Sequence, residues 1–169
     1  MIYLAESIFD STADAVIIPV TGTEDIPEGS IHQKFLAEVD LSYCEHYFRE
    51  VKLGIWEYTP ATCFFVREGD PWYQRWLIEV PCLPEDRFHA MQPRIERAIY
   101  LVNKLGAKSV AVPHLRCKIG TDAQEILWTW CERKLVDHGA EIHLHTQEWD
   151  DRDQPLIVQA MIEKEVTCA

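Results

Sequence analysis

The stretch 108–121 carries side chains that suit the binding of an anion. Arg116 and Lys118 are two cations in an otherwise acidic chain. The apolar run 110–112, which Pro113 ends, predicts a buried strand directly before them. Guanidinium and ammonium groups pair with phosphate, so the pattern favours a phosphate-bearing ligand. The same two cations also fit a solvated surface loop.

A helix is predicted directly after this loop. Thr121 and Gln124 have the spacing of a capping box, and apolar residues recur at helical intervals over 121–138. Backbone N–H groups at a helix N-terminus bind phosphate, and ligands of α/β proteins lie beyond the carboxyl ends of the strands. We therefore expect a phosphate site over residues 114–122. The alternative is a strand, loop and helix without a ligand.

A thiol and a pair of histidines are further candidates for chemistry. Cys117 lies near two cations and a helix start, which would lower its pKa and favour a nucleophile, but His114 is its sole nearby partner. His143 and His145 share one face of a predicted strand, which suits a metal pair. A third ligand does not stand out beside them, so we expect two histidines on an exposed face and no metal.

Composition bounds the class of protein. The 169 residues, 47% of them hydrophobic, suit a single domain over 1–169. The net charge of −12 argues against general nucleic-acid binding. The sequence has neither a signal-peptide pattern nor an apolar run long enough to span a membrane, which predicts a cytoplasmic location. The six cysteines form no Cys-x-x-Cys pair and are expected to be reduced, mainly core residues: Cys44, Cys63, Cys82, Cys117, Cys131 and Cys168.

Hydrophobic periodicity predicts alternating strands and helices. Strands are expected at 1–4, 15–18, 62–66, 74–80, 108–112 and 141–146, and helices at 30–40, 41–53, 121–138, 155–165 and from near Pro93 to 105. Pro19 is expected to end the second strand, Pro93 to lie in a first helical turn, and 141–146 to have one wetter face. The strands 62–66 and 74–80 are expected to form a hairpin or an adjacent pair around the turn at 69–71. This order predicts an α/β/α sandwich with a mixed sheet.

Three segments resemble the macrodomain family, whose α/β/α modules bind ADP-ribose and in some members hydrolyse its conjugates. Residues 14–21, Asp-Ala-Val-Ile-Ile-Pro-Val-Thr, resemble the family's Asp-Ala-Ile-Val-Asn-Ala-Ala-Asn. Residues 29–32, Gly-Ser-Ile-His, resemble the Gly-x-Ile-His of its first ligand helix, and residues 109–115 resemble the segment before its phosphate loop. The resemblance implies a three-layer sandwich with a mostly parallel sheet.

The polar residues of the family motifs are changed. Ser7 stands where the family has the Asp that hydrogen-bonds adenine, and Thr21 stands where it has an Asn. Residues 116–121, Arg-Cys-Lys-Ile-Gly-Thr, replace a loop of three glycines. The chain looks closest in length to the short branch that removes ADP-ribose from acidic side chains or nucleic-acid bases. The catalytic Lys and Asp of that branch do not carry over, because Lys34 and Asp122 are near neighbours only.

The resemblance implies a set of site residues. His32, in the first turn of a helix beside the expected pyrophosphate, is a candidate hydrogen-bond donor or general base, with an exposed helix histidine as the alternative. Asp122 is a candidate for orienting water, although an Asp in a first helical turn also has a dipole explanation. Ligand contacts are expected from Ser7, Thr21, Gly29, Ser30, Ile31, Arg116, Cys117, Lys118, Ile119, Gly120, Thr121 and Trp149.

The expected function is binding of ADP-ribose or a related nucleotide diphosphate sugar, without a cofactor. Removal of ADP-ribose from an ADP-ribosylated macromolecule is left open. The alternative is an inactive macrodomain scaffold that serves as a protein-interaction module, using the aromatic and acidic stretch 43–58 or the tryptophans of 72–76. Exposed tryptophans would favour that alternative, and a closed cleft would favour the nucleotide.

Overall fold

The computed structural model describes residues 2–4, 6–67, 72, 74–83, 85–113 and 139–145. Within them lies one sheet of six strands in the order β1-β6-β5-β2-β4-β3. The strands are β1 Ile2–Leu4, β2 Ala15–Val20, β3 Thr62–Phe65, β4 Trp76–Pro81, β5 Ser109–Val112 and β6 Glu141–His145. All neighbours are parallel except β3 and β4. The predicted mixed, mostly parallel sheet is confirmed.

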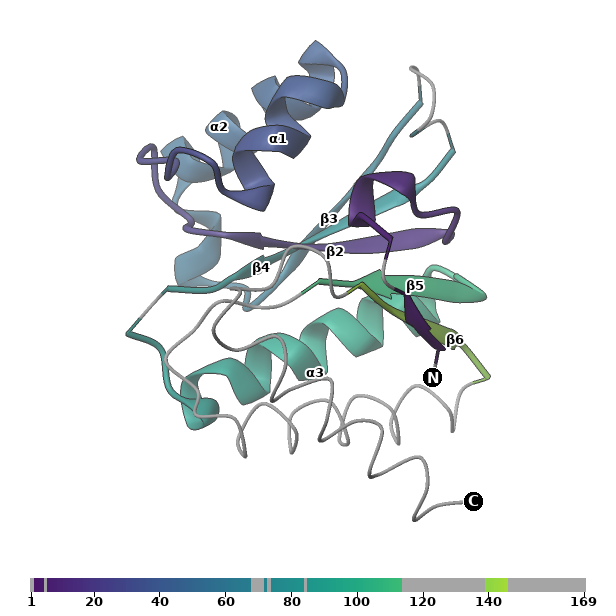
Figure 1. Ribbon diagram of the computed structural model, residues 1–169. Helices are drawn as coiled ribbons and strands as arrows, with labels where there is room; N and C mark the ends of the chain where they lie inside the picture. The colour runs from purple at the N-terminus through teal and green to yellow at the C-terminus, as the bar shows by residue number, and fades with distance from the viewer. Residues whose placement is uncertain are drawn as a thin grey trace.

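Helices cover both faces of the sheet. The helix α3, Phe88–Lys104, lies on one face, and α1, Ile31–Glu38, and α2, Leu41–Leu53, lie on the other (Figure 1). Two short 3-10 helices, η1 Ile8–Asp10 and η2 Ile55–Glu57, complete the described elements. This is the three-layer α/β/α arrangement that the sequence predicts.

The central strand β2 shows why the sheet is buried on both sides. Ala15 and Ile17 belong to the core cluster under α3, whereas Val16 and Ile18 belong to the cluster under α1 and α2. Successive side chains of a strand point to opposite faces, so an unbroken apolar run is what a doubly covered parallel strand requires. The sequence signal at this strand and its position in the sheet therefore agree.

The predicted end of β2 at Pro19 is wrong, because the strand continues to Val20. The carbonyls of Asp14 and Val20 accept bonds from the β4 side, so by alternation the imino nitrogen of Pro19 faces the β5 side. The described pairs with β5 are at Ala15 and Val16. Pro19 therefore lies beyond that ladder, where its missing N–H removes no ladder bond.

The start of α3 also differs from the prediction. The helix begins at Phe88, so Pro93 lies beyond its first turn. A proline there cannot bond to the carbonyl of residue 89, four positions earlier. His89 is on the exposed side of the helix, where water can solvate that carbonyl.

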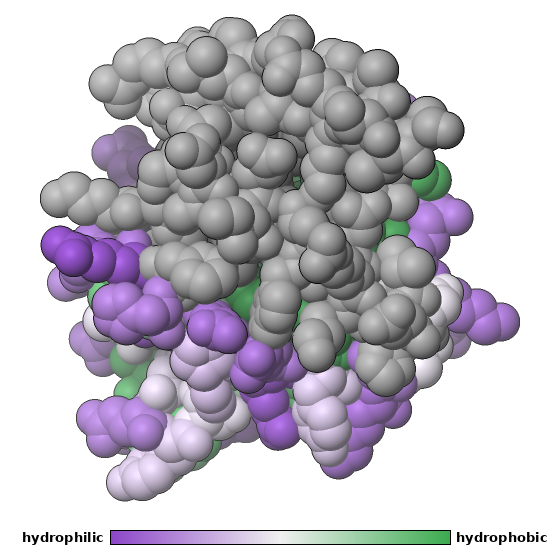
Figure 2. All heavy atoms as spheres, turned by 90° about the horizontal axis from the view of Figure 1, so that it is seen from below, coloured by the Kyte–Doolittle hydropathy of each residue, from purple (hydrophilic) through white to green (hydrophobic). Residues whose placement is uncertain are grey.

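The face of the molecule in Figure 2 shows mainly hydrophilic side chains on its described part, with small separate apolar areas. In the part of the chain that the structure describes, no helix combines the length and apolar character needed to cross a bilayer.

Candidate functional site

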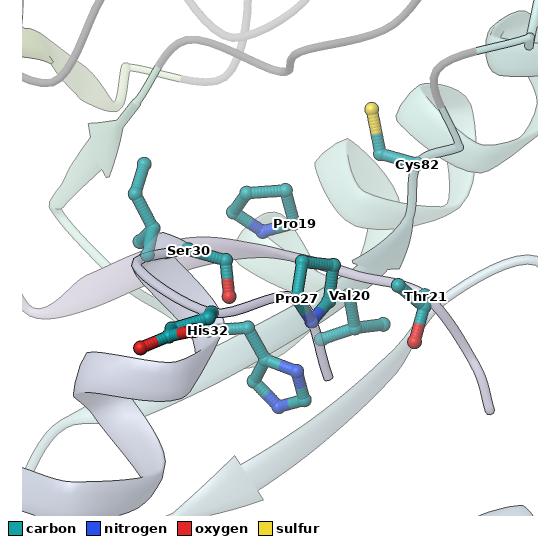
Figure 3. A pocket seen from close by; sticks show the side chains of 9 residues that line it. Pro19, Val20, Thr21, Pro27, Ser30, His32 and Cys82 are labelled. Carbon is teal, nitrogen blue, oxygen red and sulfur yellow. The ribbon is translucent and has the colours of Figure 1, made fainter. Parts of the chain in front are cut away.

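A cavity of about 220 Å³ lies where β2 ends and α1 begins. Figure 3 shows that the side chains around it come from the end of β2, the loop into α1, the first turn of α1 and the end of β4. The residues that line it are Pro19, Val20, Thr21, Pro27, Glu28, Ser30, Ile31, His32 and Cys82. The carboxyl ends of parallel strands and a helix N-terminus meet at this point, as in the ligand sites of open α/β sheets.

The first turn of α1 is held by two side-chain bonds. The hydroxyl of Ser30 accepts a hydrogen bond from the N–H of Gln33 at 3.1 Å, which makes Ser30 the predicted N-cap. The amide oxygen of Gln33 in turn accepts from the N–H of Gly29 at 2.7 Å. Gly29 has a φ of +75°, a conformation that side chains disfavour. This turn presents the N–H groups of Ile31 and His32, which have no carbonyl partner within a helix.

His32 is buried at the wall of the cavity, with 2% of its surface exposed. Its ring packs edge-on against Tyr47, with centroids 4.3 Å apart, and neither ring nitrogen has a hydrogen-bond partner among the described residues. The alternative of an exposed helix histidine is therefore wrong. Burial lowers the pKa of His32 from 6.5 to about 4, so the imidazole is neutral at pH 7. A neutral imidazole can donate to an anion but is a weak general base.

The loop from β2 to α1 is anchored on α2. The hydroxyl of Tyr47 donates to the carbonyl of Thr23 at 2.7 Å and lies 3.5 Å from Oγ1 of Thr21. Thr21 Oγ1 donates to the carbonyl of Asp25 at 3.1 Å and accepts from the N–H of Thr23. Because Thr21 lines the cavity, these bonds set the shape of its rim.

The variant Tyr47→Phe tests this anchor. Loss of the hydroxyl removes the bond to Thr23, and we expect unfolding to become easier by about 1 kcal/mol. Binding in the cavity should weaken as well, because the loop that carries Thr21 loses its tie to α2. Thermal unfolding and ligand titration measure the two effects. Tyr58→Phe is the matched control, since Tyr58 is 84% exposed; equal behaviour of the two variants would contradict the role of Tyr47.

A second cavity, of about 290 Å³, lies beside the first and shares Thr21 with it. Its walls include Gly22, Trp56, Leu83 and Arg94. Trp56 covers Gly22 closely, since a Cβ there would lie 3.6 Å from the indole ring. Arg94 is held by Asp86 at 2.6 Å and donates to the carbonyl of Pro81 at 2.9 Å. The guanidinium of Arg94 is therefore already paired with Asp86 and with the carbonyl of Pro81.

The structure brings together part of the predicted site. Thr21, Ser30, Ile31 and His32 line the first cavity. Gly29 does not line it but supports the turn that does. Ser7 is not among its lining residues either. Its hydroxyl accepts from the N–H of Phe9 at 3.3 Å and caps η1. The remaining candidates lie outside the described residues: Arg116, Cys117, Lys118, Ile119, Gly120, Thr121, Asp122 and Trp149.

The cavity also includes residues that the sequence did not indicate as site residues. Cys82 is a core residue, as the sequence predicts, and it also lines the cavity directly after β4. The rule that sites lie at carboxyl ends of strands could have indicated it. Pro27 and Glu28 lie in a loop whose position the sequence predicted, but the loop has no motif of its own.

The expectation of two exposed histidines on β6 is wrong for His145. Its ring is fully buried, and Nδ1 lies 3.0 Å from the carbonyl oxygen of Glu6. Along β6 only Glu141 is exposed and His143 is half-buried, while Ile142, Leu144 and His145 are buried, so the predicted wetter face is reduced to the start of the strand. His143 is half-buried and contacts Glu141, with Nε2 2.6 Å from Oε1. The pair therefore makes contacts within the protein.

Three solved structures share this architecture. A macrodomain of Oceanobacillus iheyensis with MES bound superposes with a TM-score of 0.71 at 10% identity, covering 96% of this chain and 92% of that chain. The same organism's macrodomain with ADP gives 0.69 at 12% identity, covering 96% and 91%. The macrodomain of Mycobacterium tuberculosis DarG gives 0.66 at 18% identity, covering 84% and 95%. The chain has the macrodomain fold.

The likeness to macrodomains is found by comparison of structures and not by comparison of sequences. No family model matches the chain, and no curated protein matches it either. The likeness to macrodomains is therefore one of fold. The cavity lies at the segment 19–32, which contains the motif 29–32 and the last three residues of the motif 14–21.

Proposed function

We propose that this protein binds ADP-ribose, or a related nucleotide diphosphate sugar, at the cavity between β2 and α1. The observation that carries the proposal is the cavity itself, which combines an apolar floor with the first turn of a helix. Such a turn offers N–H groups and a positive dipole end to a pyrophosphate. The similarity to a macrodomain solved with ADP supports the choice of nucleotide.

The size of the cavity indicates how much of the ligand it takes. About 220 Å³ is less than the roughly 300–1,000 Å³ typical of a site that encloses a whole ligand. We propose that it holds the pyrophosphate and the adjoining sugar, near the N–H groups of Ile31 and His32. Residues 116–121, with Arg116 and Lys118, and Trp149 are proposed to contact the rest of the ligand, as is Ser7.

We assign His32 a role in ligand binding and not the role of general base. Its neutral ring can donate a hydrogen bond to a sugar or phosphate oxygen without being protonated first. Hydrolytic removal of ADP-ribose from a macromolecule then needs another group to orient a water molecule, and Asp122 is the candidate from the sequence. The cytoplasmic location and the single-domain organisation over 1–169 stay predictions from sequence.

Calorimetric titration with ADP-ribose, ADP, AMP and ribose 5-phosphate tests the function. We expect saturable one-to-one binding of ADP-ribose, weaker binding of ADP, and little heat from AMP, since AMP lacks both the pyrophosphate and the second sugar. Equal affinity for AMP and ADP-ribose would contradict the proposed role of the cavity. Absence of any binding and of any thermal shift would refute nucleotide binding and favour the protein-interaction module.

A further inference from the structure

A cluster of metal-ligating side chains lies away from the cavity, between α2 and the sheet. His46 and Glu50 are four residues apart and therefore share one side of α2. Glu79 extends from β4 toward the same helix, on the sheet face opposite to α3. One potential ligand atom from each of the three residues lies within 4.8 Å of the other two. A nitrogen and two carboxylate oxygens thus converge from two elements distant in sequence.

Two of these atoms meet without forming a hydrogen bond. Nε2 of His46 lies 2.7 Å from Oε1 of Glu50 and 3.6 Å from Oε1 of Glu79. Yet His46 Nε2 and Glu50 Oε1 are buried without a hydrogen-bond partner among the described residues, so the close approach lacks the required direction. Glu50 is 7% exposed and Glu79 is fully buried. The three side chains therefore bring one nitrogen and two carboxylate oxygens within 4.8 Å of one another at a place where two of these atoms have no hydrogen-bond partner among the described residues.

The surroundings hold the three side chains in place. Tyr43 donates to Oε2 of Glu79 at 3.4 Å, and the hydroxyl of Thr62 donates to Oε1 of Glu79 at 3.2 Å. The ring of His46 packs on Phe64, with centroids 4.8 Å apart. Hydrogen bonds to a ligating carboxylate and a fixed imidazole are the outer contacts that metal sites use to orient their ligands. The side chain of His46 is 28% exposed, which leaves a path for an ion and a water.

We propose that His46, Glu50 and Glu79 bind a divalent transition-metal ion, with Zn²⁺ the best match, at a site that joins α2 to β4. One imidazole and two carboxylates suit zinc, and water would take the fourth position. Tetrahedral ligands at about 2.1 Å from zinc lie about 3.4 Å apart, close to the His46 to Glu79 separation of 3.6 Å. Small rotations of Glu50 would complete the set.

A bound cation would also explain why the carboxyl groups of Glu50 and Glu79 lie side by side in a buried place. Glu79 is fully buried and Glu50 is 7% exposed, so both carboxyl groups are removed from most of the solvent. Two ionised carboxylates side by side in a protein interior are strongly unfavourable unless a positive charge compensates them. His46 supplies at most one such charge, and then at the edge of the cluster. A divalent ion compensates both carboxylates and uses the imidazole as a neutral ligand.

The test titrates the chelator-treated full chain with zinc chloride by calorimetry, with thermal unfolding alongside. We expect one zinc per chain and a melting temperature raised by roughly 5–10 °C at a zinc concentration about 100 times the Kd. Glu79→Gln and His46→Gln should each lower the affinity by more than the about 100-fold seen for residues that merely orient a ligand. Glu79→Gln keeps the shape of the side chain, so its metal-free unfolding temperature should match or exceed that of the parent.

The control variant is His143→Gln, because His143 and Glu141 form a contact of the same type on β6. It should bind zinc as the parent does. Anomalous diffraction from a zinc-loaded crystal should place the ion between His46, Glu50 and Glu79. Absence of binding at micromolar zinc, unchanged affinity in Glu79→Gln and His46→Gln, or an ion at the cysteines would each overturn the proposal.

Discussion

Replacement of Cys82 by tryptophan is expected to abolish the binding of ADP-ribose. Cys82 is 8% exposed and lines the cavity at the end of β4, opposite the first turn of α1. An indole ring at this position would occupy much of the space of about 220 Å³ that the ligand needs. We expect the affinity to fall by more than about 100-fold, which corresponds to about 2.7 kcal/mol of binding free energy. Calorimetric titration measures the loss.

Cys82→Ala is the matched control for this variant. It makes the cavity larger, so the affinity for ADP-ribose should stay within about threefold of the parent, or about 0.7 kcal/mol. The backbone bond from Cys82 N–H to the carbonyl of Val20, at 2.8 Å, does not depend on the side chain and should persist in both variants. Thermal unfolding verifies that Cys82→Trp is folded. A folded Cys82→Trp protein with normal affinity would place the ligand elsewhere.

The second large expected effect is that His32 lowers the free energy of unfolding in acid. Its pKa is 6.5 in an unfolded chain and about 4 in the folded protein, because burial disfavours the charged ring. The unfolded chain therefore takes up a proton at this residue before the folded protein does. The contribution of His32 to the free energy of unfolding is fully present above pH 6.5 and is lost as the pH decreases toward 4. The expected loss from this residue is about 3 kcal/mol between pH 7 and pH 4.

Denaturant unfolding of the parent and of His32→Phe at pH 7, 6, 5 and 4 measures this contribution. Phenylalanine cannot be protonated, so the difference in stability between the two proteins should change by about 3 kcal/mol over that range, while shared carboxyl titrations cancel. Among the described residues, the titratable groups near His32 are the phenols of Tyr43 and Tyr47, the thiol of Cys82 and the carboxylate of Glu28.

Glu28 carries a carboxylate that lines the same cavity as His32. The variant Glu28→Gln therefore serves as a check that the effect belongs to His32. His89→Gln is the control for an exposed histidine and should follow the parent at every pH. A difference between the parent and His32→Phe that does not change with pH would show that His32 is not a buried neutral ring.

Local patterns predicted most of the described elements. The Ser30 cap, the helix that Gly54 ends and the pair β3 and β4 follow from residues close in sequence, because caps, glycine turns and hairpins are local structures. The errors at Pro19 and His145 concern burial and strand neighbours. A proline in a strand is tolerated or not depending on which side its nitrogen faces, and this is set by the register with β4 and β5.

For the site, the sequence by itself determined which segments lie at the carboxyl edge of the sheet, since a buried strand followed by a capped helix specifies that geometry locally. The resemblance of residues 14–21 and 29–32 to macrodomain motifs then indicated Thr21, Ser30, Ile31 and His32 as site residues, and all four line the cavity. Only the tertiary structure decided that Cys82 joins them, that His32 is buried against Tyr47, and that Glu79 meets His46 and Glu50. The physical reason is that burial and the meeting of side chains depend on how distant elements pack, and a local pattern carries no information about that packing.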